Sequence, residues 1–244
     1  MIQKSRGFTL IEIAIVLVII GLLLGGVLKG QELITGARVR NLISQQDGIK
    51  AAFFGFQDRY RALPGDYASA STNINCPTPP CLNGNGNGQI EAPGAVVNGS
   101  EPHEELLVWT HLTSAGFLNG SYNMVAGAAA PIDANNPKNP YSVYLQLVYD
   151  GFYGVSTTTT GSTPKHNLKT GSQIPVEILA EVDRKVDDGN PTSGGFQFSG
   201  AAIGGATAPT PTGATGCYVA QAGTTPAAWN IAATSTNCGA ASLF

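Results

Sequence analysis

An apolar run near the N-terminus constrains this chain more than any other feature. Residues 13–28 carry no polar side chain, and the run extends back to residue 8 with interruptions only at Thr9 and Glu12. A helix over residues 8–28 is roughly 30 Å long, which matches the hydrocarbon core of a bilayer. A secretory signal peptide has a shorter apolar region followed by a small-residue cleavage site, and no A-x-A pattern follows here. The sequence therefore predicts a membrane-spanning helix over residues 8–28.

The rest of the chain has a different composition, rich in Gly, Ala, Thr, Ser and Asn. Charged residues make up only 12% of the 244 residues, and the formal net charge is −3. A nucleic-acid-binding protein would need a basic face, so no nucleic-acid partner is expected. The hydrophobic share of 43% excludes wholesale disorder, and the length fits one domain with an attached segment.

Glu12 is out of place in the apolar run. A carboxylate inside a membrane segment costs about 2.5–3.5 kcal/mol on insertion scales, and such residues have a partner in the proteins that keep them. No basic residue lies four positions away within the run. We expect the partner to come from another chain or from a terminal amine.

The residues around Glu12 resemble a known processing site. The string Ser5-Arg6-Gly7-Phe8-Thr9-Leu10-Ile11-Glu12 is similar to that of type IV prepilins and type II secretion pseudoprepilins. The resemblance implies a leader peptide over residues 1–7, with Lys4 and Arg6 as its basic residues. It also implies that a prepilin peptidase cuts between Gly7 and Phe8 and methylates the new N-terminus of Phe8.

The same resemblance implies a role for Glu12 and a set of partners. In a filament, the Glu12 carboxylate would meet the Phe8 ammonium of a neighbouring pilin or pseudopilin subunit. The chain would cross the inner membrane once with its N-terminus in the cytoplasm, and an inner-membrane assembly platform would build it into a pilus or a periplasmic pseudopilus. Basic residues lie on both sides of the span, so charge alone does not decide this orientation.

The helix is expected to continue beyond the membrane over residues 29–63. Its apolar residues are spaced three and four apart, apart from one slot filled by Gln46, and so share one face that a globular head domain would cover. They are Val39, Leu42, Ile49, Phe53, Phe56, Tyr60 and Leu63. Pro64-Gly65 ends the helix, and residues 64–244 form the head.

The head has the pattern of a small α+β domain, with an antiparallel sheet packed on the long helix and decorated by long loops. This is the pilin-like fold class that the resemblance implies. Helices are expected from Ser100 to Gly116 and over 173–187. Strands are expected over 142–149, over 152–157 after an Asp150-Gly151 hairpin turn, over 196–198 and over 217–219. The remaining loops are expected over 64–100, 157–163, 200–216 and 222–237.

Four cysteines lie beyond the membrane span, in the part expected to meet an oxidising compartment. They allow three pairings, and the pairing that is local in the sequence joins Cys76 to Cys81 and Cys217 to Cys238. The resemblance supports the second pair, since type IV pilins also have a C-terminal disulfide loop.

Two groups of residues are candidate cation sites. Asn83, Asn85 and Asn87, followed by Glu91, echo the first half of an EF-hand calcium loop, although the residue at the twelfth position is Gly94. Asp183, Asp187 and Asp188 form a second group. A polar turn is the alternative for the first group and a solvated turn for the second. No cofactor besides calcium is expected.

No catalytic residues are predicted, and the chain is not expected to be an enzyme. It has three histidines, no G-x-S-x-G and no H-E-x-x-H, and His103 and His111 are interpreted as surface or structural residues. Three functions remain to be compared: a pilin-like filament subunit, most simply a minor type IV pilin with adhesion as one role; a membrane-anchored hydrolase; and a membrane-tethered calcium- or ligand-binding module. Glu12 favours the first, because a plain anchor gains nothing from an acid in the membrane.

Overall fold

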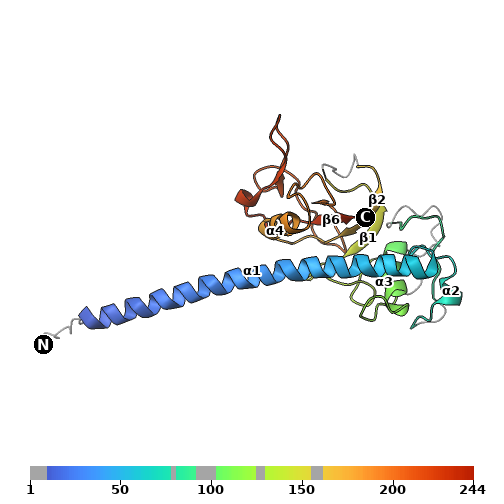
Figure 1. Ribbon diagram of the computed structural model, residues 1–244, viewed down its shortest axis with the longest axis horizontal. Coiled ribbons are helices and arrows are strands. Elements are labelled where there is room, and N and C mark those ends of the chain that lie inside the picture. Colours follow the sequence, from blue (N-terminus) through green and yellow to red (C-terminus); the bar gives the residue numbers. More distant parts are fainter. Residues whose placement is uncertain (1–9, 78–80, 92–102, 125–129, 155–161) are drawn as a thin grey trace. The chain divides into compact units, whose positions relative to one another are not determined.

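The computed structural model describes residues 10–77, 81–91, 103–124, 130–154 and 162–244. The chain forms two compact units, residues 1–38 and 39–244. In the first unit the described residues belong to helix α1, which begins at Leu10 and ends at Tyr60 in the second unit (Figure 1). Gly7 and Phe8 lie outside the described residues.

The part of α1 in the second unit carries the apolar stripe predicted from the sequence. Its buried residues are Val39, Leu42, Gln46, Ile49, Ala52, Phe53 and Phe56. Tyr60 and Leu63 are partly buried against the same core. The helix ends just before Arg61, whose φ is 54°. This confirms the expected end ahead of Pro64-Gly65.

The second unit adds three further α-helices, a 3₁₀ helix and six strands among its described residues. In chain order they are α2 (Ala70–Asn73), α3 (Glu104–Ser114), β1 (Gln146–Asp150), β2 (Lys165–Lys169), α4 (Val176–Val186), β3 (Phe196–Phe198), β4 (Tyr218–Val219), β5 (Ala228–Trp229), η1 (Ile231–Ala233) and β6 (Ala240–Leu243). The result is the α+β fold that the sequence predicted.

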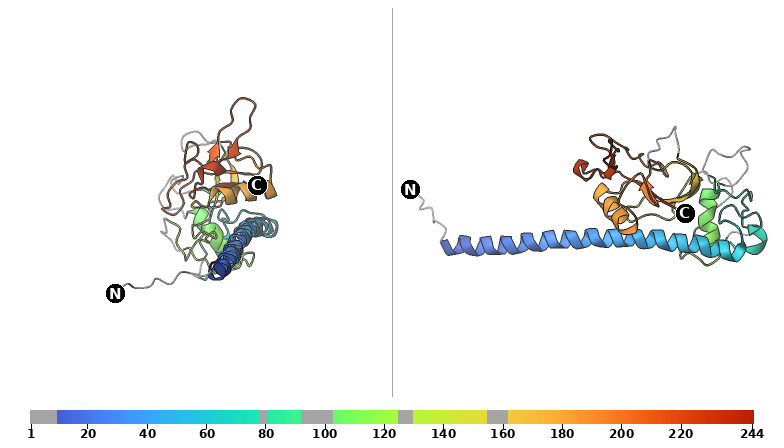
Figure 2. Two further views of the ribbon diagram at one scale, coloured as in Figure 1. Left: turned by 90° about the vertical axis from the view of Figure 1, so that its left-hand side faces the viewer. Right: turned by 45° about the horizontal axis from the view of Figure 1, so that its top comes forward.

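The main sheet has four antiparallel strands in the order β1-β2-β6-β3. The C-terminal strand β6 lies inside the sheet, with Ser242 opposite Leu168 on one side and Phe196 on the other. A separate two-stranded sheet pairs β4 with β5. Within the second unit, α4 packs with Val39 and Leu42 of α1, and in Figures 1 and 2 α3 lies beside the C-terminal end of α1.

Two clusters of apolar side chains build most of the core. One packs Val39 and Leu42 of α1 against α4, β3 and the disulfide-bonded C-terminal segment. The other packs Phe53 and Phe56 against Trp109 of α3 and against the first two strands. The long helix therefore contributes to both clusters, which is why its buried face extends from Val39 to Phe56 and includes Gln46.

One expected hairpin is wrong. The predicted turn at Asp150-Gly151 is not a two-residue turn, because Asp150 is the last residue of β1 and pairs with Lys165. Phe152 to Gly154 form no strand, and the rest of the expected return strand lies outside the described residues. The Gly151 carbonyl instead accepts a hydrogen bond from the Ser162 N–H at 2.8 Å, so a longer connection leads to β2.

Other boundaries differ by a few residues or were missed. Helix α4 begins at Val176, after Pro175, and not at Gln173. The expected start of α3 at Ser100 lies outside the described residues; the described helix begins at Glu104. Strands β2, β5 and β6 were not predicted, and β5 and η1 interrupt the loop expected over 222–237.

Candidate assembly segment and head-domain sites

The N-terminal part of α1 exposes a continuous apolar surface. Among its large side chains, Leu10 is 88% exposed and Leu22 is 73% exposed. By length and composition this helix can cross a membrane. Glu12 lies in its first turn. A helix that is apolar on every side needs lipid or other apolar helices around it, so this segment is built for a membrane or for association with other chains.

Two disulfides tie the head together, and the pairs are those predicted from the spacing. Cys76 is bonded to Cys81, and both belong to the core cluster that contains Trp109 of α3. Cys217 is bonded to Cys238, with 21 positions between them in the sequence. The backbone of Cys238 also forms an isolated bridge with Ile174, so this bond fixes the C-terminal segment beside the start of α4.

The asparagine-rich loop that resembles a calcium loop is organised by two acids from outside it. Asp66 accepts the N–H groups of Asn87 and Gly88 at 2.9 and 2.8 Å. Glu104, at the start of α3, accepts those of Asn85 and Glu91 at 2.9 and 3.2 Å. The loop is therefore folded around the carboxylates of Asp66 and Glu104, of which the sequence had indicated only Glu104 as a nearby acid.

The side chains of the same loop are also engaged. The Oδ1 atoms of Asn83, Asn85 and Asn87 accept backbone N–H groups at 2.7 to 2.9 Å. The amide nitrogens of Asn85 and Asn87 donate to Glu91. These contacts describe a polar turn, and calcium binding by this loop stays a prediction.

Glu104 and His111 of α3 are buried ionisable groups that hold loop backbone. The ring of His111 accepts from the Gly65 N–H at 3.0 Å and lies 3.0 Å from the Leu82 carbonyl. Burial lowers the pKa of His111 to about 4, opposed only in part by that carbonyl. Burial raises the pKa of Glu104 to about 7, although the N–H groups of Asn85 and Glu91 lower it. His111 is thus a structural residue and not a surface one.

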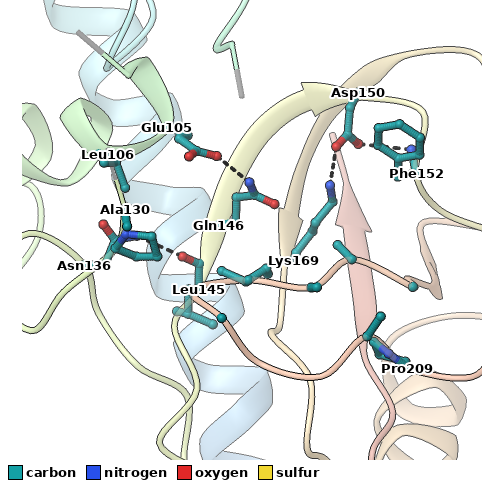
Figure 3. Close-up of a pocket in the computed structure, with 18 of the residues that line it drawn as sticks. Glu105, Leu106, Ala130, Asn136, Leu145, Gln146, Asp150, Phe152, Lys169 and Pro209 are labelled. Carbon is teal, nitrogen blue, oxygen red and sulfur yellow. Dashed lines mark hydrogen bonds and ion pairs between the residues drawn. The ribbon is translucent and has the colours of Figure 1, made fainter. Parts of the chain in front are cut away.

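A cavity of about 680 Å³ lies beside β1 and β2 (Figure 3). Glu105 accepts a hydrogen bond from Gln146 on one wall, and the buried Lys169 forms an ion pair with Asp150 on another. Burial raises the pKa of Glu105 to about 7, which the Gln146 hydrogen bond and the Lys169 charge oppose. Among the described lining residues there is no Ser, Thr, Cys or His, and the charged residues are Glu105, Asp150 and Lys169.

The second candidate cation site lies at the C-terminal end of α4. One carboxylate oxygen from each of Asp183, Asp187 and Asp188 lies within 4.8 Å of the others. Asp183 is buried, whereas the other two are exposed. The structure therefore brings together the three residues that the sequence singled out as a second candidate cation site.

The N-terminal segment of the chain is similar to a known protein family. Residues 2–28 match the family model of the prokaryotic N-terminal methylation motif. The chain carries the N-terminal signature of type IV pilins and pseudopilins. No curated protein and no solved structure matches the chain.

This pilin-type signature contains all three residues predicted for processing and assembly, Gly7, Phe8 and Glu12. Its match ends at residue 28, together with the apolar run, so the head of this pilin-type chain is described by its own structure alone. Sequence reasoning missed the roles of Asp66 and His111 in the head. Each acts on backbone far from it in the sequence, and no local pattern marks such contacts.

Proposed function

We propose that this chain is a pilin-like structural subunit, anchored in the inner membrane and assembled into a filament through its N-terminal helix. The observation that carries the proposal is the methylation motif over residues 2–28, which leads directly into an apolar helix. Prepilin peptidase would remove residues 1–7 and methylate Phe8. The inner-membrane assembly platform would then add the processed subunit to the growing filament.

The head supports a structural role in an extracytoplasmic compartment. Both disulfides lie beyond the membrane segment, and disulfides persist in oxidising compartments. Of the two systems that share the signature, we favour a minor type IV pilin, because long loops decorate the head. The first alternative is a type II secretion pseudopilin. The second alternative is a membrane-tethered calcium- or ligand-binding module that never polymerises.

N-terminal processing is the first test. We expect mass spectrometry of the membrane-extracted protein to find an N-methylated Phe8 as the first residue. Replacing Gly7 with a bulky residue should block the cut, while Gly7→Ala should leave it partial. An intact Met1, or a cut near residue 30, would contradict the proposal.

Location is the second test. Sheared surface filaments labelled with an antibody against this chain separate a pilus subunit from a periplasmic pseudopilin. Label along or at the tip of filaments supports the minor pilin. Protein that is processed but confined to the periplasmic side of the inner membrane supports the pseudopilin.

A further inference from the structure

The cavity of about 680 Å³ in the head contains polar groups whose hydrogen-bonding capacity the fold does not use in full (Figure 3). Its volume lies in the range of about 300–1,000 Å³ that small-molecule pockets occupy. The lining comes from α3, β1 and β2 and from the segment over residues 200–205. Five of these six residues are Gly or Ala, so the segment closes the cavity without filling it with side chains.

Strand pairing places three polar side chains on the same face of the sheet beside the cavity. Gln146 and Asp150 are four residues apart on β1, so their side chains share a face. Lys169 of β2 lies opposite Gln146 in the register, and its side chain reaches Asp150. Glu105 of α3 accepts a hydrogen bond from Gln146 (Figure 3). These four residues form a polar wall in the cavity.

The ammonium group of Lys169 has hydrogen-bond donors to spare. Its side chain is 2% exposed, and an ammonium group carries three N–H donors. Among the described residues, Asp150 is the acceptor for one of them. Asp150 is fully engaged, because its other oxygen accepts the Phe152 N–H at 3.2 Å and the Asn167 amide at 3.0 Å. The other N–H groups of Lys169 are therefore buried without a protein acceptor in the described part of the chain, which costs free energy.

A spare acceptor belongs to the same cavity lining. Asn136 is 3% exposed, and its amide nitrogen donates to the Leu145 carbonyl at 3.1 Å. Its Oδ1 is buried and has no hydrogen-bond partner among the described residues. A ligand that completes both groups has to offer acceptors to Lys169 and a donor to Asn136.

The charges in the cavity favour a ligand without a net charge. Lys169 and Asp150 compensate each other, and burial raises the pKa of Glu105 to about 7, so its charge is partial at neutral pH. A cation would meet the Lys169 ammonium, and an anion would meet the carboxylates. The other large side chains of the lining are apolar: Leu106, Pro131, Leu145, Phe152, Ile203 and Pro209.

We propose that this cavity binds a neutral sugar ring. Sugar hydroxyls donate and accept at the same time, so they suit both the Lys169 N–H groups and the Asn136 oxygen. The C–H groups of the ring are apolar and pack against aromatic side chains, and Phe152 in the lining is 43% exposed. A purely apolar ligand would leave the polar wall without partners. The inference rests on the head alone and does not depend on the proposed function.

The test uses the full chain in micelles of a detergent that has no sugar headgroup. Saturation-transfer NMR measures the binding of glucose, galactose, mannose, N-acetylglucosamine and N-acetylgalactosamine, each added separately. We expect at least one of these neutral sugars to bind. The amino-sugar and uronic-acid derivatives of that sugar, and N-methylacetamide as an amide without a ring, should each bind at least about tenfold more weakly.

Two variants remove the groups on which the proposal depends. The double variant Asp150→Asn, Lys169→Met removes the ammonium donors and takes out both charges together, so no buried charge is left unpaired. Phe152→Ala removes the exposed ring. Each variant should weaken sugar binding at least about tenfold. Circular dichroism checks that each has folded, and Phe152→Ala decides the matter if the double variant has not.

Each variant has a matched control outside the cavity lining. The double variant Glu181→Gln, Lys185→Met removes an ion pair of 2.6 Å on α4, and Phe54→Ala removes a ring on α1 that is 49% exposed. Both controls should bind the sugar as the wild type does. The proposal would be overturned if the folded wild-type chain bound none of the neutral sugars, or if binding survived in a folded cavity variant. Equal losses in the controls would overturn the location, and equal binding of the charged derivatives or of N-methylacetamide would overturn the assignment to a neutral sugar.

Discussion

At the scale of single residues, His111 links the stability of the head to pH. Its pKa is about 4 in the folded head, because the ring is buried, against an ordinary value near 6.5. Between these values the unfolded chain binds more protons than the folded one. Stability from this residue is therefore complete above about pH 6.5 and is lost as the pH falls toward 4.

The substitution His111→Gln isolates the pH dependence of the free energy of unfolding that His111 causes. We expect the variant to be less stable than the wild type at pH 7, because the contacts to Gly65 and Leu82 are disturbed. The difference should shrink by up to about 3 kcal/mol on going to pH 4, since only the wild type has a histidine to protonate. Urea unfolding of the full chain in detergent, followed by Trp fluorescence, measures it.

The comparison between His111→Gln and the wild type also cancels the opposite pH dependence of stability that Glu104 and Glu105 cause. Glu104 and Glu105 have raised pKa values of about 7, so the folded head binds more protons at these sites and loses stability as the pH rises. Both glutamates are present in wild type and variant and cancel in the difference. A stability difference that stays constant from pH 7 to pH 4 would contradict the role given to His111.

The ion pair between Lys169 and Asp150 gives a second prediction at this scale. The side chain of Lys169 is 2% exposed and that of Asp150 is 11% exposed, so neither charge is well solvated without the other. Lys169→Met should destabilise the head by about 3–5 kcal/mol, because it leaves a buried carboxylate uncompensated. The double variant Asp150→Asn, Lys169→Met should recover much of this loss. Equal losses in the single and double variants would show that packing, and not charge, is responsible.

At the scale of elements, the two disulfides should contribute unequally. The chain-entropy model gives a stabilisation of about 3 kcal/mol for closing the loop between Cys217 and Cys238 and about 2 kcal/mol for the short loop between Cys76 and Cys81. Replacing each pair by alanine, one pair at a time, tests the order in urea unfolding. Non-reducing peptide mapping of the wild type checks that both bonds form. A larger loss for the Cys76–Cys81 pair would mean that its place in the core matters more than loop length.

The elements that could be predicted from the sequence are those with a local signal. The stripe from Val39 to Phe56 has helical spacing, and a Pro-Gly pair follows it. The second half of α1 and its buried face could therefore be predicted from the sequence. Strands β2 and β6 were missed for a physical reason. The sequence of β2 is Lys-His-Asn-Leu-Lys, and β6 contains two alanines, so neither has the β-branched, alternating pattern of a strand. Their conformation is fixed by long-range pairing.

The same distinction holds for the candidate sites. The processing motif, the two disulfides and the three aspartates after α4 are close in the sequence and could be recognised there. The support of the asparagine-rich loop by Asp66 and Glu104, and the bond from Trp229 to Asp183, join residues from different elements. Only the fold reveals them.

At the scale of the whole molecule, the two units of the chain differ in how far their apolar side chains are exposed. The described part of residues 1–38 exposes its large apolar side chains, while the described part of residues 39–244 buries most of its own in core clusters. Changes in the first unit should therefore affect membrane residence and assembly, and changes in the second unit should affect folding. Glu12 tests this division most directly, because it is an acid within the apolar unit.

We expect Glu12→Val to separate assembly from folding. The substitution removes a charge from the membrane segment, so insertion should be as good as in the wild type or better. What is lost is the proposed pairing with the Phe8 ammonium of a neighbouring subunit, and with it the register between subunits. The variant should be cut after Gly7, accumulate in the inner membrane with both disulfides formed, and be strongly depleted from sheared filaments.

The matched control is Glu32→Val, the same substitution on the same helix beyond the apolar run. Glu32 is exposed and pairs with Lys29 at 2.6 Å, and an exposed pair of this kind contributes little. This variant should enter filaments as the wild type does. Quantitative immunoblotting of sheared filaments against the membrane fraction compares the two. If Glu12→Val were incorporated as well as Glu32→Val, Glu12 would have no assembly role, and a membrane-tethered binding module would explain the chain better than a filament subunit.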